Sequence, residues 1–217
     1  MPTLTSKART ILVVAAENFE LKYIPAKPAK NGQQWILVAN GPGPTLAGEA
    51  VDRITQQVDA ILNVGLCGAL VPELGIGDIV LGSSVNGVTI DVPKTTRKSV
   101  VGPLASIDRV AQTVEEKAQL RETGAIAVEM EAAAVLDRAR RRDVPFYCVR
   151  AVSDTAFEGF ELDLNATRDK AGRFRVGRIL AQAACKPLSG VPELLRLRRN
   201  SELASKALGE FIGNCSF

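Results

Sequence analysis

Short apolar runs alternate along the chain with stretches whose apolar residues recur at helical spacing. Continuous apolar runs rich in Val, Ile and Leu are typical of strands buried on both faces. Strands are expected at 10–16, 34–40, 60–65, 77–85, 125–130 and 145–153, with weaker candidates at 87–92 and 98–102. Helices are expected at 45–58, 109–120, 131–142 and in two stretches after residue 163. This alternation predicts an α/β fold: a single three-layer α/β/α domain over 1–217 with a central mixed, largely parallel sheet.

The composition agrees with one ordinary globular domain and argues against nucleic acid and membrane as partners. The chain has 217 residues and a formal charge of +3, which is too small to favour nucleic acid. The basic runs 138–142 and 196–199 are expected to be solvated helix faces, with a basic partner surface as the alternative. We expect no membrane span, and we see no signal-peptide pattern. Four cysteines without a C-x-x-C pair favour reduced thiols and a cytoplasmic location.

The chain contains no histidine, which restricts its chemistry. Catalysis by Ser-His-Asp or Cys-His groups and any histidine-ligated metal site are excluded. Acid–base work must therefore fall to carboxylates, Tyr, Lys or Cys. We expect no metal and no organic cofactor.

Polar or glycine-rich stretches interrupt the apolar pattern where predicted strands end, which is where α/β proteins bind ligands. Glu17 and Glu20 follow the first strand; one could act as a general base, or both could only complement a helix dipole. The loop 41–44 (GPGP) admits a ligand or forms a plain tight turn, and it fits no dinucleotide or Walker motif. Cys67 and Gly68 follow the third strand, in a glycine-rich stretch that suits a flat ligand or marks a bulge.

Two further acidic positions follow buried strands. Glu129 and Glu131 lie among small apolar residues at a strand-to-helix join, where glutamates are rare without a partner. Ser153 and Asp154 end another buried strand, where the Asp caps the strand or serves as a partly desolvated acid. Such carboxylates could break an N-glycosidic bond. One protonates the leaving base and another stabilises an oxocarbenium-like ribosyl group, which water or phosphate attacks.

The stretches VGLCGALVPELGIGDIV (64–80), AIAVEMEAAAV (125–135) and VPFYCVRAVSDTA (144–156) carry a family resemblance. Together they resemble the purine nucleoside phosphorylase / uridine phosphorylase superfamily, and within it most closely the methylthioadenosine/S-adenosylhomocysteine nucleosidases. The motif V-E-M-E-x-A-A followed by R-x-[IV]-S-D is the specific part, and the likeness covers residues 10–157.

The resemblance implies a role for each catalytic position. Asp154 would be the general acid at purine N7, oriented by Ser153. Glu20, rather than Glu17, would activate the attacking water.

The resemblance also implies the substrate contacts. Glu131 would accept hydrogen bonds from the ribose 2′ and 3′ hydroxyls, and Met130 would pack under the ribose. Glu129 would be an auxiliary ribose contact or would only hold the loop. Val110 and Ala111 would lie beside the base.

The chain departs from the phosphorylases of this family at the phosphate site. They usually hold phosphate with arginines after the first strand and at the end of the third, where this chain has an acidic segment and then Asn63 and Leu66. Phosphate without an arginine clamp is bound poorly, which favours water as the nucleophile. An arginine from another segment or subunit, or the 41–44 loop with Thr45, could still bind phosphate. Phosphate therefore remains an alternative co-substrate.

The sequence thus predicts hydrolytic cleavage of a purine, adenosine-type nucleoside, and a 5′-thio or bulky apolar 5′ group is one option for its substituent. One alternative is a phosphate-dependent phosphorylase, including relatives acting on nucleosides with a bulky or lipid 5′ group. Another is a nucleoside-binding protein without turnover. By the resemblance we expect a homo-oligomer, a dimer first. Residues 165–217 match the family poorly and are expected to shape the 5′ pocket or an interface.

Overall fold

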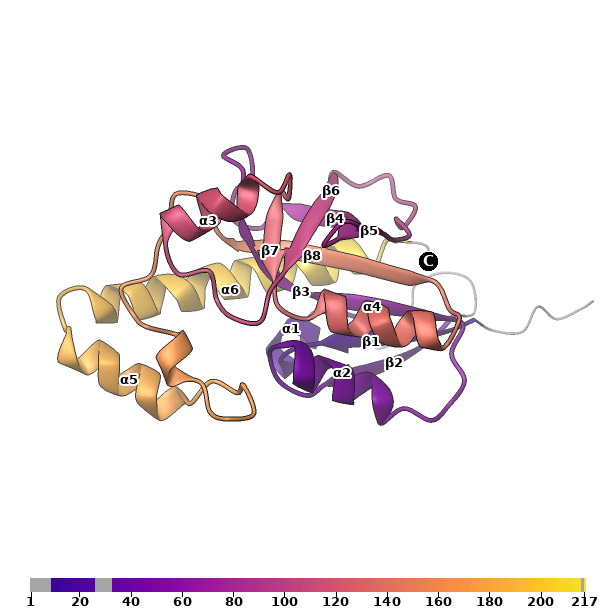
Figure 1. Ribbon diagram of the computed structural model, residues 1–217, viewed down its shortest axis with the longest axis horizontal. Coiled ribbons are helices and arrows are strands. Elements are labelled where there is room, and N and C mark those ends of the chain that lie inside the picture. The colour runs from indigo at the N-terminus through magenta and orange to yellow at the C-terminus, as the bar shows by residue number, and fades with distance from the viewer. Residues whose placement is uncertain (1–8, 26–32, 216) are drawn as a thin grey trace, which may run out of the picture.

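A computed structural model describes residues 9–25, 33–215 and 217, where strands and helices alternate as predicted (Figure 1). The strands are β1 Thr10–Ala15, β2 Gln34–Ala39, β3 Ala60–Ala69, β4 Ile79–Val85, β5 Val88–Thr89, β6 Val100–Ser106, β7 Ala127–Glu129 and β8 Phe146–Asp154. The helices are α1 Asn18–Leu21, α2 Pro44–Asp52, α3 Val114–Arg121, α4 Ala132–Arg141, α5 Val176–Cys185 and α6 Gly190–Ile212, with a 3-10 turn η1 at Asn165–Thr167. The single domain over 1–217 stays a prediction, and residues 1–8, 26–32 and 216 lie outside the described part.

The strands of the described residues join one mixed sheet. Its path runs β2-β1-β3-β7-β6-β4-β5, while β8 pairs in parallel with β3 and antiparallel with β4. In the described chain five strand pairs are parallel and three are antiparallel, so the predicted mixed, largely parallel sheet is confirmed. Because β8 links β3 to β4, the strands β3, β7, β6, β4 and β8 form a closed circuit, which the sequence did not predict.

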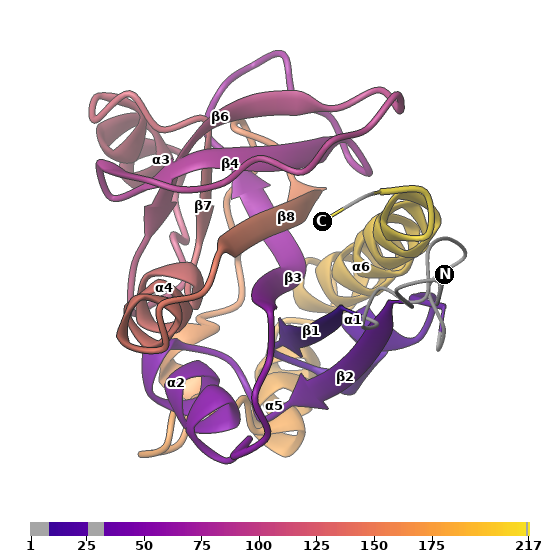
Figure 2. The same ribbon diagram turned by 90° about the vertical axis from the view of Figure 1, so that its right-hand side faces the viewer.

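Helices cover both faces of the sheet, as the three-layer prediction requires. Successive residues of a strand point to opposite faces. In β1, Ile11 and Val13 therefore pack in a core with Leu208 of α6, whereas Leu12 and Val14 pack in a second core with residues of α2 and α4. Figure 2 shows α2 and α4 on one side of β1 and β3, and α6 on the other. Burial on both faces explains why β1 is apolar throughout.

Two predicted helices are shorter than their apolar spacing suggested. The helix expected at 45–58 ends at Asp52, yet Ile54 and Val58 still pack in the core, because spacing reports burial rather than backbone conformation. The helix expected at 109–120 begins at Val114, since Thr113 and Glu116 form a reciprocal capping box at its N-terminus.

None of the helices in the described ranges is both long and apolar enough to cross a membrane. All four cysteines are free thiols. The predicted homo-oligomer stays a prediction.

Candidate functional site

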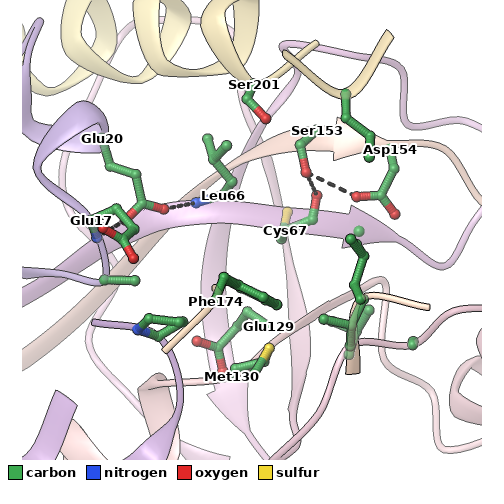
Figure 3. Close-up of a pocket in the computed structure, with 18 of the residues that line it drawn as sticks. Glu17, Glu20, Leu66, Cys67, Glu129, Met130, Ser153, Asp154, Phe174 and Ser201 are labelled. Atoms are coloured by element: carbon green, nitrogen blue, oxygen red, sulfur yellow. Dashed lines mark hydrogen bonds between the residues drawn. The ribbon is translucent and has the colours of Figure 1, made fainter. Parts of the chain in front are cut away.

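A cavity of about 330 Å³ lies where β1, β3, β7 and β8 end. All ten side chains predicted to act or bind line it: Glu20, Cys67, Gly68, Val110, Ala111, Glu129, Met130, Glu131, Ser153 and Asp154. Figure 3 shows Glu20 and Asp154 at opposite ends of the cavity, with Glu129 and Met130 on a third side.

Asp154 ends β8 and is almost fully buried. Its Oδ1 lies 2.9 Å from the Ser153 hydroxyl, which can donate either to this oxygen or to the Cys67 carbonyl oxygen at 3.2 Å. Its Oδ2 accepts a hydrogen bond of 2.5 Å from Lys117. Burial raises the pKa of Asp154, and the Lys117 ammonium group opposes that rise. A Cβ at Gly68 would lie 2.7 Å from Asp154 Oδ2, so the glycine leaves room for the acid.

Glu20 lies on the short helix α1, and its carboxylate is fixed by two backbone groups. Oε1 accepts a hydrogen bond of 3.0 Å from the N–H of Leu66, and Oε2 accepts one of 2.8 Å from the N–H of Glu17. Burial raises the pKa of Glu20 above its ordinary value, and these backbone hydrogen bonds and Arg150 limit the rise. Glu17 also lines the cavity but is less buried, so Glu20 is the better placed of the two glutamates.

Glu131 is the N-cap residue of α4 and presents its carboxylate to the cavity. Its Oε1 accepts a hydrogen bond of 2.8 Å from the backbone N–H of Gly43, so the 41–44 loop positions this carboxylate. Burial raises the pKa of Glu131, and the neighbouring Glu129 and Glu20 carboxylates add to the rise.

Glu129 holds the strand-to-helix join together. Its Oε2 accepts hydrogen bonds from the backbone N–H groups of Glu131, at 3.0 Å, and Ala132, at 2.8 Å. The same oxygen is paired with Arg150, which is wholly buried. With one oxygen so committed, Glu129 is better suited to fixing the loop than to contacting a sugar.

Arg150 is a site residue that the sequence analysis did not select. Its Nη2 contacts Glu129, Asn63 and, at 3.6 Å, Glu131 Oε2. Within the described part of the chain, its Nε and Nη1 have no hydrogen-bond partner. A single cation thus faces three carboxylates, since Glu20 is also close enough to affect its pKa. The signal was visible: a charged residue stands in the middle of an apolar strand.

Gly65 allows Arg150 and Glu20 to approach each other. A Cβ on Gly65 would lie 2.8 Å from Glu20 Oε1 and would overlap the Arg150 guanidinium. Any larger residue here would separate the two side chains.

Lys117 on α3 is the second residue that was missed. Its side chain is buried, and besides Asp154 it donates to the carbonyl oxygens of Thr155 and Glu158. A lysine on a polar helix gives no sign in the sequence that it turns inward.

Apolar side chains from the C-terminal third form much of the cavity wall. They come from the segment that the resemblance covered poorly and from the turn before it: Phe160, Leu164, Phe174, Ile179 and Leu197. The buried Glu193 of α6 fixes the start of this wall, because it accepts hydrogen bonds from the backbone N–H groups of Glu161 and Leu162. The segment therefore lines the cavity, and its predicted roles in a 5′ pocket or an interface stay predictions.

Val110 and Ala111 lie in the loop before α3, as expected. The side chain of Asn165 bonds both the N–H of Val110, at 2.9 Å, and its carbonyl oxygen, at 3.0 Å. The backbone N–H and carbonyl groups of Val110 are therefore already bonded, and its contact with the base stays a prediction. In the described residues no group of three or more His, Cys, Asp or Glu side chains could hold a metal ion.

Comparison with known proteins connects this chain to one family. The model of the Phosphorylase superfamily matches residues 15–105 and 86–184. A 5′-methylthioadenosine/S-adenosylhomocysteine nucleosidase from Shewanella sediminis (strain HAW-EB3) is 26% identical over an alignment of 186 positions, which covers 69% of this chain and 81% of the relative.

Solved structures share the fold at low sequence identity. The 5′-methylthioadenosine/S-adenosylhomocysteine nucleosidase from S. pneumoniae gives a TM-score of 0.67 at 17% identity, over 94% of this chain and 96% of that one. A futalosine hydrolase from Helicobacter pylori gives a TM-score of 0.64 at 16% identity, over 94% and 96% of the two chains.

Proposed function

Because this chain belongs to the phosphorylase superfamily, we propose that it hydrolyses the N-glycosidic bond of a purine ribonucleoside with an apolar 5′ substituent. It is an enzyme of one of two classes, an N-glycosyl hydrolase or a nucleoside phosphorylase. The observation that carries the proposal is one cavity with a buried acid, Asp154, and a buried base, Glu20, at opposite ends.

Asp154 is suited to protonate the leaving base. Burial raises its pKa, which helps a carboxyl group keep a proton until a purine nitrogen can take it. The proton passes to N7, and the electron pair of the C1′–N9 bond moves into the base as the bond breaks. The purine then leaves as a neutral molecule.

Glu131 is suited to bind the ribose. A carboxylate accepts two hydrogen bonds from vicinal hydroxyls, and its negative charge stabilises the oxocarbenium-like sugar. The hydrogen bond from Gly43 fixes one of its oxygens before substrate arrives.

Glu20 is suited to take a proton from water on the far side of the sugar. The water oxygen bonds to C1′, one of its protons passes to Glu20, and ribose forms. Asp154 and Glu20 exchange protons with solvent to complete the cycle. Nη1 of Arg150 lies beside Glu20 at Gly65, and the charge of Arg150 lowers the pKa of Glu20, which helps to keep the proposed base ionised.

The charge around this end of the cavity favours water over phosphate. Three buried carboxylates, Glu20, Glu129 and Glu131, face one arginine, which is already paired with Glu129. A dianionic phosphate at this end of the cavity would be repelled by the uncompensated carboxylates, and Arg150, already paired with Glu129, is not free to clamp it.

The apolar wall supports the choice of 5′ substituent. Phe174, Ile179 and Leu197 offer no hydrogen-bond or ionic partner to a charged group. Contacts with these side chains would therefore not offset the free energy of desolvating that group. The relatives act, by their names, on 5′-methylthioadenosine and S-adenosylhomocysteine.

The test is an assay of adenosine, 5′-methylthioadenosine and adenosine 5′-monophosphate, each with and without phosphate. We expect free ribose products at the same rate in both conditions, with 5′-methylthioadenosine cleaved fastest and the monophosphate slowest. A strict phosphate requirement with a ribose 1-phosphate product would refute hydrolysis. Preference for the monophosphate would refute the apolar 5′ subsite.

A further inference from the structure

The Lys117 ammonium group is wholly enclosed by acceptors. Its side chain is 1% exposed, and Nζ donates to Asp154 Oδ2 at 2.5 Å and to the carbonyl oxygens of Thr155, at 2.7 Å, and Glu158, at 2.8 Å. Three acceptors use all three N–H bonds of an ammonium group. Burying a lysine is costly, so such a group needs strong partners.

The contacts with the two carbonyl oxygens only hold the turn after β8, but the third contact is with the carboxylate of Asp154, the proposed acid. Lys117 Nζ also lies 5.5 Å from the ring centre of Phe160, another residue of the cavity wall. A purely structural lysine would have no need to bond the carboxylate that faces the substrate.

We propose that Lys117 is a positioning residue for proton transfer to the leaving base, and that its ammonium charge stabilises the carboxylate that Asp154 becomes. This inference rests on the proposed function. In the step, the proton moves from the Asp154 carboxyl group to purine N7, and the C1′–N9 electron pair moves into the base. Lys117 keeps its own proton throughout, so the product is an ion pair in place of a buried lone anion.

The charge of Lys117 and the burial of Asp154 have opposite effects on the acid strength of Asp154. Burial favours the neutral acid, and the cation favours the anion. The other titratable groups near Asp154 are Cys67 on β3 and Glu158 in the following turn, which is paired with Arg196 of α6. Without Lys117, the pKa of Asp154 should rise further. The acid would then stay protonated to higher pH but transfer its proton less readily.

The experiment compares two leaving groups in three Lys117 variants. A purine nucleoside needs an acid, whereas 4-nitrophenyl ribofuranoside releases a stable anion and does not. The variants are Lys117→Met, Lys117→Gln, which keeps hydrogen-bond donors without the charge, and Lys117→Arg, which keeps the charge. Lys98→Met, at an exposed lysine, is the matched control.

In Lys117→Met and Lys117→Gln we expect kcat for the purine nucleoside to fall about 10- to 100-fold, part of the contribution of a general acid. The KM should change by less than about threefold, and nitrophenyl riboside cleavage should stay within about threefold of wild type, because ribose binding is untouched. The alkaline limb of the purine pH profile should move to higher pH. Lys117→Arg should recover part of the loss, and Lys98→Met should match wild type.

Equal losses of kcat on both substrates, with the alkaline limb of the pH profile unchanged, would overturn the inference. That is the result expected if Lys117 has a purely structural role. Should Lys117→Met not fold, Lys117→Gln decides by the same readouts, because it retains donors for the turn. Variants that cleave the purine nucleoside as fast as wild type would also overturn it, leaving the proposed function intact. A wild-type chain that cleaves neither substrate would instead overturn the proposed function, and this inference with it.

Discussion

Glu129 and Glu131 are separated by one residue, yet their carboxylates do different work. Glu129 ends β7 and bonds the backbone of the next turn and Arg150. Glu131 caps the helix beyond, and among the described residues its side chain bonds the N–H of Gly43, with Arg150 at a longer distance. The backbone changes from strand to helix between these two residues, so their side chains point toward different partners.

Replacing each glutamate by glutamine should separate binding from stability. In Glu131→Gln, we expect kcat/KM for a ribonucleoside to fall about 10- to 100-fold, the worth of one or two hydrogen bonds to a charged group. The loss should be smaller for the 2′-deoxynucleoside, which lacks one hydroxyl. Steady-state kinetics with both nucleosides measures this.

Glu129→Gln is the matched control. It leaves Arg150 buried without its main counter-charge, and we expect a loss of about 3–5 kcal/mol in the free energy of unfolding, measured in urea. A stable Glu129→Gln protein with impaired ribose selectivity would contradict this division of roles.

The residues that sequence could predict were those in local motifs at strand ends. All ten were brought to one cavity. Arg150 and Lys117 were missed because their meaning depends on distant partners: Arg150 meets Asn63 across two paired strands, and Lys117 meets Asp154 from a helix. Neither of these two contacts can be derived from the spacing of residues along the chain.

At the scale of elements, the proposed acid and the proposed base both lie against the end of β3. Glu20 bonds the N–H of Leu66, and Asp154 packs over Gly68, which pairs with it across the β3–β8 ladder. A bulge between Cys67 and Gly68 shifts the register there. Bulges near ligand sites re-aim side chains, and here the shift sets Asp154 opposite the glycine.

Gly68→Ala should lower activity through displacement of Asp154. The new methyl carbon would lie 2.7 Å from Asp154 Oδ2 and 3.3 Å from Val128, so the acid must move. We expect kcat to fall by about 100-fold or more, because misplacing a reacting group by about 1 Å has that effect. Purine release under saturating substrate measures it.

Gly177→Ala on α5 serves as the comparison, since a methyl group there meets nothing within 4 Å. Alanine is the better helix former by up to about 1 kcal/mol, so this variant should be at least as stable as wild type and as active. Similar activity losses in both variants would refute the steric argument.

Element types were predictable because burial on both faces makes strands apolar throughout, as in β1. Boundaries were less predictable. Val58 has helical spacing with Ala50 and is buried, yet it lies outside α2. The circuit closed by β8 was not predictable at all, because strand order depends on which elements meet in space.

At the scale of the whole molecule, the proposed base lies on α1, just after the first strand, and the proposed acid ends the last strand, so the pair depends on elements from both ends of the described chain. Both carboxyl groups are buried, and both have raised pKa values. The two must nevertheless be in opposite protonation states for hydrolysis.

The pH dependence of kcat/KM should therefore be bell-shaped. Glu20 must be ionised, so activity falls as pH drops through its pKa, which lies above the ordinary 4.5. Asp154 must be protonated, so activity falls as pH rises through its own raised pKa. Rates measured from acid to alkaline pH check both limbs.

Glu20→Gln should remove the acid limb along with about 100-fold or more of the rate, the usual contribution of a general base. Glu17→Gln should keep the acid limb, since the backbone N–H of Glu17 that holds Glu20 Oε2 is unchanged. Loss of the Glu17 charge, which raises the pKa of Glu20, should move that limb toward lower pH. An acid limb that survives in Glu20→Gln would assign the base elsewhere.

The apolar wall has a consequence for how nucleoside preference can diverge. The groups proposed to break the bond come from residues 20–154, whereas Phe160, Leu164, Phe174, Ile179 and Leu197 belong to one later, continuous stretch. Mutation, insertion or exchange of that stretch would alter which 5′ substituents fit while sparing the acid, the base and the ribose carboxylate. The proposed roles therefore place selectivity and bond cleavage in different stretches of the chain, and a graft of residues 160–197 between relatives should change the first and keep the second.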